Sequence, residues 1–471
     1  MTRLMKQHVN RARCVIALGV TAMALVAGCD RVKTELLAPQ NPGLVDPTAV
    51  ANPTAALALR IGAIGRYKQV VNANGNESIW AYGGVLADEY KNADFEVGRI
   101  AADQRITDPA VQNRGYDSVT KARGAVRYAI DGLHTYLPDS TGLIGELFAE
   151  LGFMEMTLAD NYCNGIPLGH TVNGVFENGT PLTIQQVYDS ANAHFDSAIA
   201  NATKADPGSV SANRLARIWK ARVLIAKDKA NAPAAAALVA AVPTTYVYDM
   251  TFSATGGSNG LWFVNNSTAR ISVADSFDLV GGAVNVIKNA LPFASANDPR
   301  VPVQNGATIT PSIPAEDGVT KPFYLSYLYK GQFDPLVLAS GVDARLYEAE
   351  GKLQGGDIAG MMSILNTLRT ATPRPVIGLT TVAAMPALAT PADQASAVSL
   401  LFREKAFWTF GRGQRLPDLR RLVRQYGRPQ DQVFPTGVFF KGGNYGTDVN
   451  FPVPNIEFNN PLFTGCLDRK A

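Results

Sequence analysis

Four stretches between residues 119 and 230 repeat apolar side chains at the spacing of one helix face. The first runs from 119 to 137 and is followed by LPDSTG; the second covers 147–162. The third, TIQQVYDSANAHFDSAIANA, opens with a capping box, in which Thr183 is followed three positions later by Gln186. DPGS (206–209) then breaks the pattern, and ANRLARIWKARVLIAKDKA follows as an antiparallel partner. Because apolar residues three and four apart share a helix face, the pattern predicts two successive helical hairpins.

Alanines at positions of close helix approach favour tetratricopeptide-type packing, although the repeat of roughly 34 residues is not strict. Residues 243–335 are rich in Gly, Asn, Ser, Thr and Pro and contain β-prone pieces such as TTYVYDM and PFYLSYLYKGQF. This composition predicts long loops with small β-hairpins, where binding residues are commonly found. Helical patterns resume at 341–371 and 391–410. The expected fold class is therefore mainly α, with a minor β component.

The beginning of the sequence has the composition of an export signal. MTRLMKQHVNRAR holds four basic residues and no acid, and CVIALGVTAMALVAGC follows. A basic start and about 15 apolar residues indicate a secretory signal, because this run is short for a transmembrane helix. VAGC, which ends at Cys29, matches the bacterial lipobox, so we expect residues 1–28 to be removed and Cys29 to carry lipid. The alternative is an ordinary cleavage site beside an incidental cysteine.

Residues 29–55 contain four prolines and little periodicity, which predicts an extended tether before a body at 56–471. The body has no apolar run long enough to span a bilayer, so we expect the protein to be anchored to a membrane without crossing it.

The charge of the chain argues against a nucleic-acid partner, despite the segment FWTFGRGQRLPDLRRLVRQYGR at 407–428. This segment holds six arginines, four aromatic residues and one acid, as a nucleic-acid-binding surface would. The whole chain, however, has 43 basic and 40 acidic residues, and removal of the signal leaves 39 against 40. A nearly neutral exported protein lacks the basic surface that nucleic acid requires.

Outside the signal and Cys29, the only cysteines are Cys163 and Cys466. In an oxidising compartment they predict one disulfide, with two buried free thiols as the alternative.

The sequence has no complete catalytic or metal-binding motif. Residues 256–260 match G-x-S-x-G, but no histidine follows His194, as a hydrolase base would require. The three histidines of the body have no metal-ligand spacing, and C-x-x-C and EF-hand patterns are missing. A glycosidase needs only two carboxylates, which a sequence cannot exclude. We expect a protein that is not an enzyme and has no cofactor and no metal.

Several segments resemble motifs of the SusD/RagB nutrient-uptake lipoproteins. ARLYEAEGKLQGGDIAGMMSILNTLR is similar to that family's helix-turn-helix, with its R-x-x-E-A-E core and terminal N-x-x-R. REKAFWTFGRGQRLPDLRRL resembles E-x-x-x-E-F-x-x-E-G-x-R-x-x-D-L-R-R, although Arg412 stands where many members carry Glu. NFPVPNIEFNNP resembles the closing P-x-P-x-x-E-x-x-x-N-P. LADNYCNGIPL resembles L-x-D-x-Y-G-D-x-P, from which Cys163 and Asn164 depart. With the lipobox, these segments run from residue 26 to 461 in family order.

The resemblance implies a SusD-like fold and a lipid-anchored outer-membrane protein, placed at the cell surface. Such a protein acts as the lid of a SusC/RagA-type TonB-dependent transporter and captures an oligosaccharide or peptide. The resemblance also implies that Arg415, Asp418 and Arg420 fix a structural corner over Trp408 and Phe410. The alternative is a periplasm-facing tetratricopeptide scaffold that binds other proteins. Asp30 favours that alternative, because Asp after the lipid cysteine retains some lipoproteins at the inner membrane.

Candidate ligand residues come from the aromatic and polar types that bind sugars. One group lies in or beside ESIWAYGGVLADEYKNADFEVGR, near the binding face in the family, and the other lies in the central loops. For each, core packing is the alternative. The candidates are Trp80, Tyr82, Asn92, Phe95, Arg99, Trp262, Tyr324 and Tyr327.

Overall fold

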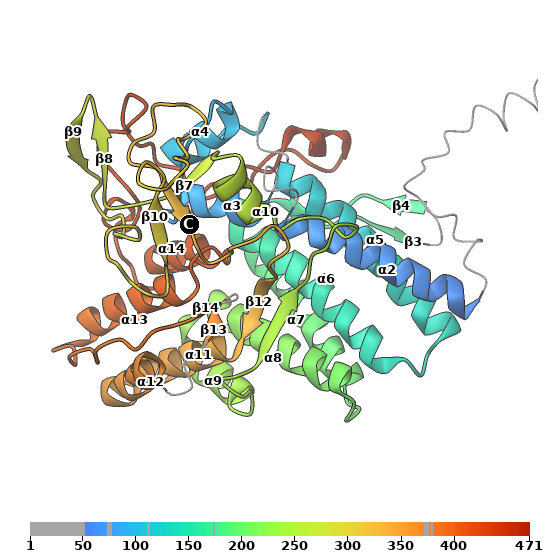
Figure 1. Cartoon of the computed structure of the whole chain (residues 1–471). Helices are drawn as coiled ribbons and strands as arrows, with labels where there is room; N and C mark the ends of the chain where they lie inside the picture. Colours follow the sequence, from blue (N-terminus) through green and yellow to red (C-terminus); the bar gives the residue numbers. More distant parts are fainter. Residues whose placement is uncertain (1–51, 73–77, 111–113, 173–174, 372–375, 378–379) are drawn as a thin grey trace, which may run out of the picture. The chain divides into compact units, whose positions relative to one another are not determined.

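Helices make up most of the regular structure of the body, as Figure 1 shows. The computed structural model describes residues 52–72, 78–110, 114–172, 175–371, 376–377 and 380–471. The helices are α2 (Pro53–Val71), α3 (Ile79–Leu86), α4 (Val97–Gln104), α5 (Arg114–Tyr136), α6 (Thr141–Asn161), α7 (Ile184–Asn201), α8 (Pro207–Lys227), α9 (Ala232–Val239), α10 (Gly260–Trp262), α11 (Gly341–Gln354), α12 (Ile358–Thr370), α13 (Gln394–Trp408) and α14 (Arg415–Arg424). The mainly α class is confirmed.

The strands are short. They are β1 (Tyr90–Asn92), β2 (Ile166–Pro167), β3 (His170–Val172), β4 (Val175–Glu177), β5 (Pro181–Leu182), β6 (Val247–Met250), β7 (Ile271–Val273), β8 (Phe277–Val280), β9 (Ala283–Val286), β10 (Val303–Asn305), β11 (Tyr324–Ser326), β12 (Leu336–Ser340), β13 (Val376–Ile377) and β14 (Thr380–Thr381). The predicted signal and nearly all of the predicted tether lie outside the described residues. Since α2 begins at Pro53, the helical body starts within the range expected for the tether.

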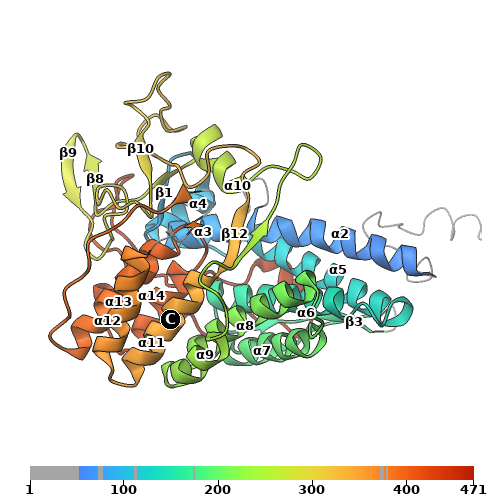
Figure 2. The ribbon, with the colours of Figure 1, turned by 60° about the horizontal axis from the view of Figure 1, so that its bottom comes forward.

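The two predicted hairpins are present as α5 with α6 and α7 with α8 (Figure 2). At the start of α7 the predicted capping box forms, with Gln186 Oε1 accepting the Thr183 N–H at 2.9 Å. Helix α8 begins earlier than expected, at Pro207, because Asp206 accepts the Ser209 N–H at 3.0 Å and caps it. Proline suits the first turn, where its missing N–H would have had no helical partner. DPGS therefore starts α8, whereas α7 has already ended at Asn201.

The core of this half is aromatic and tightly packed. The ring centroids of Phe153 and Trp219 lie 4.6 Å apart, and Trp219 is buried, as its helical spacing predicts. Gly152 lets α6 approach α7, because a Cβ at this position would lie 2.7 Å from the ring of Phe195. Close helix contact of this kind is the reason small residues recur in these hairpins.

Residues 243–335 form loops and short strands, as predicted, but most strand partners are distant in sequence. Strand β1 pairs with β7, β6 with β12, and β10 with β11, each antiparallel. Only β8 and β9 form a local hairpin here, closed by Gly281 and Gly282 with φ of 58° and 86°. Two-residue hairpin turns need such positive φ angles, which glycine adopts without strain. Both views show β8, β9 and β10 at the end of the body opposite α12 (Figures 1 and 2).

The arginines of 407–428 lie mostly inside the body. Arg415 makes two hydrogen bonds to Asp88, at 2.6 and 2.9 Å, and both side chains are buried. Arg420 donates to the carbonyls of Ala159 and Asp160 at 2.9 and 2.7 Å, where α6 ends with backbone acceptors lacking helical partners. Trp408 and Phe410 are buried, as the resemblance implies.

Asp418 and Glu350 complete this corner. Lys405 donates to Asp418 at 2.8 Å and to Glu350 at 3.2 Å, and Arg421 pairs with both acids. Burial disfavours the charged form of Glu350, but Arg421 and Lys405 outweigh this effect and lower its pKa to about 2. The cavity beside these groups has a volume of about 10 Å³, room for one water at most. The segment is a structural corner with no space for a nucleotide.

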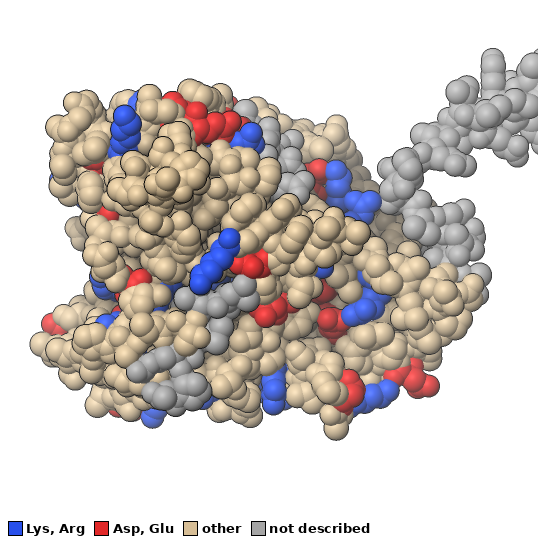
Figure 3. Space-filling view, in the orientation of Figure 1, with Lys and Arg blue, Asp and Glu red and all other residues tan. Residues whose placement is uncertain are grey.

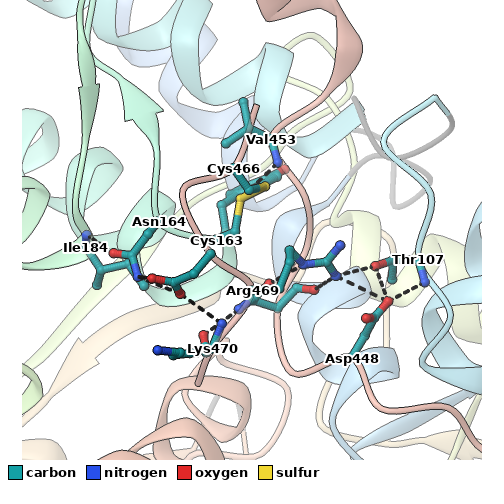
Figure 4. Close-up of a disulfide and its surroundings, with 12 residues drawn as sticks. Thr107, Cys163, Asn164, Ile184, Asp448, Val453, Cys466, Arg469 and Lys470 are labelled. Atoms are coloured by element: carbon teal, nitrogen blue, oxygen red, sulfur yellow. Dashed lines mark hydrogen bonds and ion pairs between the residues drawn. A yellow bond between two sulfur atoms is a disulfide. The ribbon is translucent and has the colours of Figure 1, made fainter. Parts of the chain in front are cut away.

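Cys163 and Cys466 are joined by a disulfide with a Cα–Cα distance of 5.9 Å (Figure 4). Neighbouring bonds hold the same region, since Asn164 Nδ2 donates to Asp468 at 3.0 Å and the Leu467 N–H donates to the Asn164 carbonyl at 2.8 Å. The C-terminal segment is therefore tied to the turn after α6.

Glu89 gives the fold a pH dependence. Burial raises the pKa of this carboxyl from 4.5 to about 8, although the Gly411 N–H donates to Oε1 at 2.9 Å. The folded state thus binds this proton more tightly than the unfolded chain, and the resulting stability is complete below about pH 4.5 and lost as pH rises to about 8. Because each pKa unit corresponds to about 1.4 kcal/mol, the wild type should lose a few kcal/mol of unfolding free energy between pH 5 and pH 8. Glu89→Gln has no carboxyl to ionise, so it should be more stable than the wild type by this amount at pH 8.

Urea unfolding at pH 5 and pH 8 measures this effect. Glu316→Gln is the control, because its side chain is partly exposed and paired with Arg270. An equal change with pH in the wild type and in Glu89→Gln would contradict the assignment.

Candidate functional site

The two groups of predicted ligand residues meet in space. Strand β1 lies within the first group and contains Asn92. It pairs with β7, which follows Trp262, so that Asn92 lies opposite Ile271. Asn265 then links this segment to β11 by donating to the Ile271 and Tyr324 carbonyls at 2.7 and 3.2 Å. Segments some 170 to 230 residues apart in the chain thereby form one unit.

Asn92 and Arg99 act as scaffold inside this unit. Lys441 donates to the Asn92 side chain and, at 2.7 Å, to the Asp94 carbonyl, and it pairs with Asp317 at 2.7 Å. Arg99 pairs with the buried Asp94. Burial disfavours the charged form of Asp317, but hydrogen bonds from Lys441 and Thr320 outweigh this effect and keep its pKa below the ordinary value. Neither candidate offers its polar group to a ligand in this conformation, which differs from the expectation.

Trp80 and Tyr82 also lie inside the body. Trp80 is 2% exposed and packs edge-on against Phe153, with ring centroids 6.4 Å apart. Tyr82 is buried, and its hydroxyl donates to Glu96 at 3.1 Å. Helix α3 is apolar on all sides and buried throughout, so its aromatic residues form core. For these two residues the core-packing alternative describes the structure.

The remaining candidates reach the surface. Phe95 is 70% exposed, and Trp262, Tyr324 and Tyr327 are half-buried. Tyr327 packs against a small core of Ala93, Phe323 and Leu325 and keeps one side open. Burial, with Asp275 nearby, raises the pKa of Tyr324, so its hydroxyl stays protonated and can donate a hydrogen bond. Partly buried rings with one open face can stack on the apolar face of a sugar.

Further apolar side chains are exposed on segments that bond to one another near β1. We call this region the head face; it comprises Phe95 with α4, the loop 316–320, the loop 437–446 and the β8–β9 hairpin. Gln104 of α4 donates to the Gly442 and Asn444 carbonyls at 3.2 and 3.0 Å, and Asn285 of β9 donates to the Val438 carbonyl at 3.0 Å. These bonds make the segments neighbours. The exposed apolar residues of the head face are Phe95, Val97, Val319, Val284, Val286 and Val438.

In the β8–β9 hairpin, the apolar side chains face solvent and a charged side chain faces the body. Phe277 and Leu279 pair with Val286 and Val284, and this apolar side is partly or fully exposed. The opposite side carries the polar pair Asp278 and Asn285, with Asp278 buried in an ion pair with Lys91. The sequence predicts small hairpins in this region without placing this one, and it gives no expectation for the loop around Lys441. GGAVNV and KGGNYG, with their paired glycines, are the local signals for both turns.

An open cleft of about 320 Å³ lies elsewhere, where α6 and α8 begin. None of the candidate residues lines it. Its lining residues are Arg60, Ser140, Thr141, Gly142, Leu143, Glu146, Lys204, Asp206, Gly208 and Ser209.

Other kinds of site have little support in the described part of the chain. It contains no group of three or more His, Cys, Asp or Glu side chains that could hold a metal ion. Ser258 of the G-x-S-x-G string lies on a loop and accepts a hydrogen bond from Gln332 at 2.6 Å. Charged residues are scattered over the face in Figure 3, with no broad basic area. No helix in the described ranges is long and apolar enough to cross a membrane.

Comparison with known proteins finds similarity in structure alone. No protein-family model and no curated protein matches the sequence. A SusD superfamily protein from Bacteroides vulgatus aligns with a TM-score of 0.59 and 15% identity, over 89% of this chain and 99% of that one. A SusD/RagB family protein from Bacteroides thetaiotaomicron aligns with a TM-score of 0.56 and 16% identity, over 86% and 94%. A laminarin-binding SusD-like protein aligns with a TM-score of 0.59 and 14% identity, over 88% and 99%. The chain therefore has the SusD-like fold.

Proposed function

We propose that this protein is a nutrient-binding lipoprotein of the outer-membrane surface, which serves as the lid of a TonB-dependent transporter. The observation that carries the proposal is the SusD-like fold, which extends over nearly the whole body. One protein of that fold is described as laminarin-binding, which favours an oligosaccharide ligand over a peptide. Lipid on Cys29 would supply the anchor.

The head face is the part of the body best suited to meet both ligand and transporter. It exposes the ring of Phe95 and several valines, it adjoins the unit of β1, β7 and β11 where the half-buried rings lie, and Lys441 braces it from within. A ligand enclosed between this face and a barrel would lose more contact with water than a ligand bound to the lid alone. We therefore expect modest affinity for the isolated protein and higher affinity for the pair.

Trp262→Ala should weaken glycan binding five- to 150-fold, by analogy with aromatic stacking worth about 1–3 kcal/mol per ring. Its ring is half-buried, so the loss of packing should be small. Titration calorimetry with a glycan identified on an array measures the effect. Phe458→Ala, which removes an exposed ring elsewhere on the body, should leave the affinity unchanged. Equal losses in both variants would argue against a binding role for Trp262.

Co-purification from native membranes in mild detergent tests the lid role. We expect a large barrel to accompany the lipoprotein, through an interface above the roughly 1,000 Å² of a specific contact. Val286→Asp on the head face should weaken this recovery. Recovery of the lipoprotein alone, together with protection from protease on intact cells, would favour the periplasmic scaffold instead.

A further inference from the structure

A second group of exposed apolar side chains lies away from the head face, beside the disulfide. On β4, Phe176 is 64% exposed; in the C-terminal segment, Phe458 is 58% exposed. Asn460 Nδ2 donates to the Gly179 carbonyl at 2.8 Å and so brings the two segments together. We call this group the C-terminal patch; it consists of Val175, Phe176, Ile456, Phe458, Leu462 and Leu467.

The patch is held firmly by the body. The disulfide (Figure 4) fixes Cys466, four residues after Leu462 and next to Leu467. The Leu467 N–H donates to the Asn164 carbonyl at 2.8 Å. The rings of Phe458 and Phe463 lie 5.3 Å apart. An apolar surface fixed in this way is ready for a partner, because little conformational freedom remains to be lost on binding.

The charge of the patch favours a protein over a lipid surface as its partner. Residues 170–182 and 455–467 contain no lysine or arginine, whereas Glu177 and Glu457 are acidic. Surfaces that bind anionic membranes carry basic residues around their apolar side chains. The two segments lack this feature; the basic residues that follow Leu467 are Arg469, which pairs with Asp448, and Lys470.

The unpaired edge of β4 indicates which protein the partner is. Within the described residues β4 pairs only with β3, and all three of its residues are exposed. An exposed strand edge can pair with the same strand of another copy, and a two-fold axis makes such a pair antiparallel and self-complementary. With the axis at Phe176, the two Phe176 residues face each other and Val175 faces Glu177. The acidic side chains would then not lie directly opposite one another.

We propose that the C-terminal patch is a self-association surface, at which β4 of one copy pairs antiparallel with β4 of a second copy. Six side chains, each about half exposed or more, provide several hundred Å² of apolar surface. A standard interface buries about 800 Å² per partner, so this dimer should be weak in solution. Anchoring in one membrane raises the effective concentration and would favour it. The proposal is independent of the nutrient-binding function.

Cross-linking of the full lipidated chain in mild detergent tests the pairing. Directly opposite residues have Cβ atoms about 5 Å apart, so Phe176→Cys should give a covalent dimer under mild oxidation. Val286→Cys is the matched control, a similarly exposed strand residue on the head face, and should remain monomeric. Adding Phe458→Asp to Phe176→Cys should lower the dimer yield at least tenfold, whereas adding Val284→Asp should not.

Sedimentation of the wild type provides a second measurement without a new cysteine. We expect a dimer whose dissociation constant rises at least tenfold in Phe458→Asp. A monomer at all concentrations, or a dimer that Val284→Asp disrupts while Phe458→Asp does not, overturns the proposal. Two further results also overturn it. In one, Cys29→Ala protein binds phosphatidylethanolamine–phosphatidylglycerol vesicles, and Phe458→Asp abolishes this binding. In the other, the protein is a monomer, and Phe458→Asp reduces its co-purification with the barrel transporter.

Discussion

Arg415→Ala should lower the free energy of unfolding by about 3–5 kcal/mol, because it leaves a buried carboxylate without its counterion. The side chain of Asp88 is 1% exposed and accepts both Arg415 hydrogen bonds; among the described residues, the other donor to it is the Leu291 N–H, at 2.8 Å. One neutral hydrogen bond cannot compensate for the loss of a bidentate, charge-assisted pair. Urea unfolding at neutral pH measures the effect.

Two comparisons separate this cause from a general loss of packing. Arg270→Ala breaks an ion pair whose side chains are 30% and 37% exposed, and should cost no more than about 1 kcal/mol. Arg415→Met combined with Asp88→Asn should recover much of the loss, because no buried charge remains unpaired. Glycan affinity, measured on the folded Arg415→Ala protein, should be unchanged. A loss no larger than that of Arg270→Ala, or a selective loss of binding, would contradict a structural role.

The elements predicted well from the sequence are those with local signals. Helix α7 has its capping box and its apolar face within one segment, so Thr183 and Gln186 are sufficient to place its start. The start of α8 was predicted too late, because DPGS carries a turn signal and a capping signal at once. Whether DPGS forms a turn or starts a helix depends on whether the following residues can bury one helix face. Here they pack against α6 and α7, and the helix forms.

The ligand candidates were harder to place, because the residue types that bind sugars also form cores. Trp80 and Phe95 are both aromatic and lie 15 positions apart, yet one is buried and the other is largely exposed. The difference arises from tertiary contacts. Helix α3 packs beneath α14, whereas Phe95 precedes α4 on the outside of the β1–β7 pair. No local pattern near residue 92 indicates that Lys441 will bind its side chain.

Removal of the disulfide should have an effect of similar size by a different route. Cys163 and Cys466 are 303 residues apart, and in the loop-entropy model a bridge of this length stabilises by about 6 kcal/mol, with about 2–5 kcal/mol common for native bridges. The folded state should persist, because Asn164, Asp468 and Leu467 still bond across the junction. We therefore expect Cys163→Ala with Cys466→Ala to fold, but to unfold at lower urea concentration.

The denaturant slope tests this mechanism. A bridge that acts on the unfolded chain keeps it compact, so its removal should expose more surface on unfolding and increase the slope. Each single alanine variant should lose about as much stability as the double variant, because either change breaks the same bond. Losses that add would indicate that the cysteines stabilise by packing. Mass mapping of the unreduced wild type should find one peptide pair joined through Cys163 and Cys466, and two free thiols would contradict the bridge. If the C-terminal patch needs this bridge for its rigidity, the double variant should also give less cross-linked Phe176→Cys dimer, which would link the fold's covalent tie to self-association.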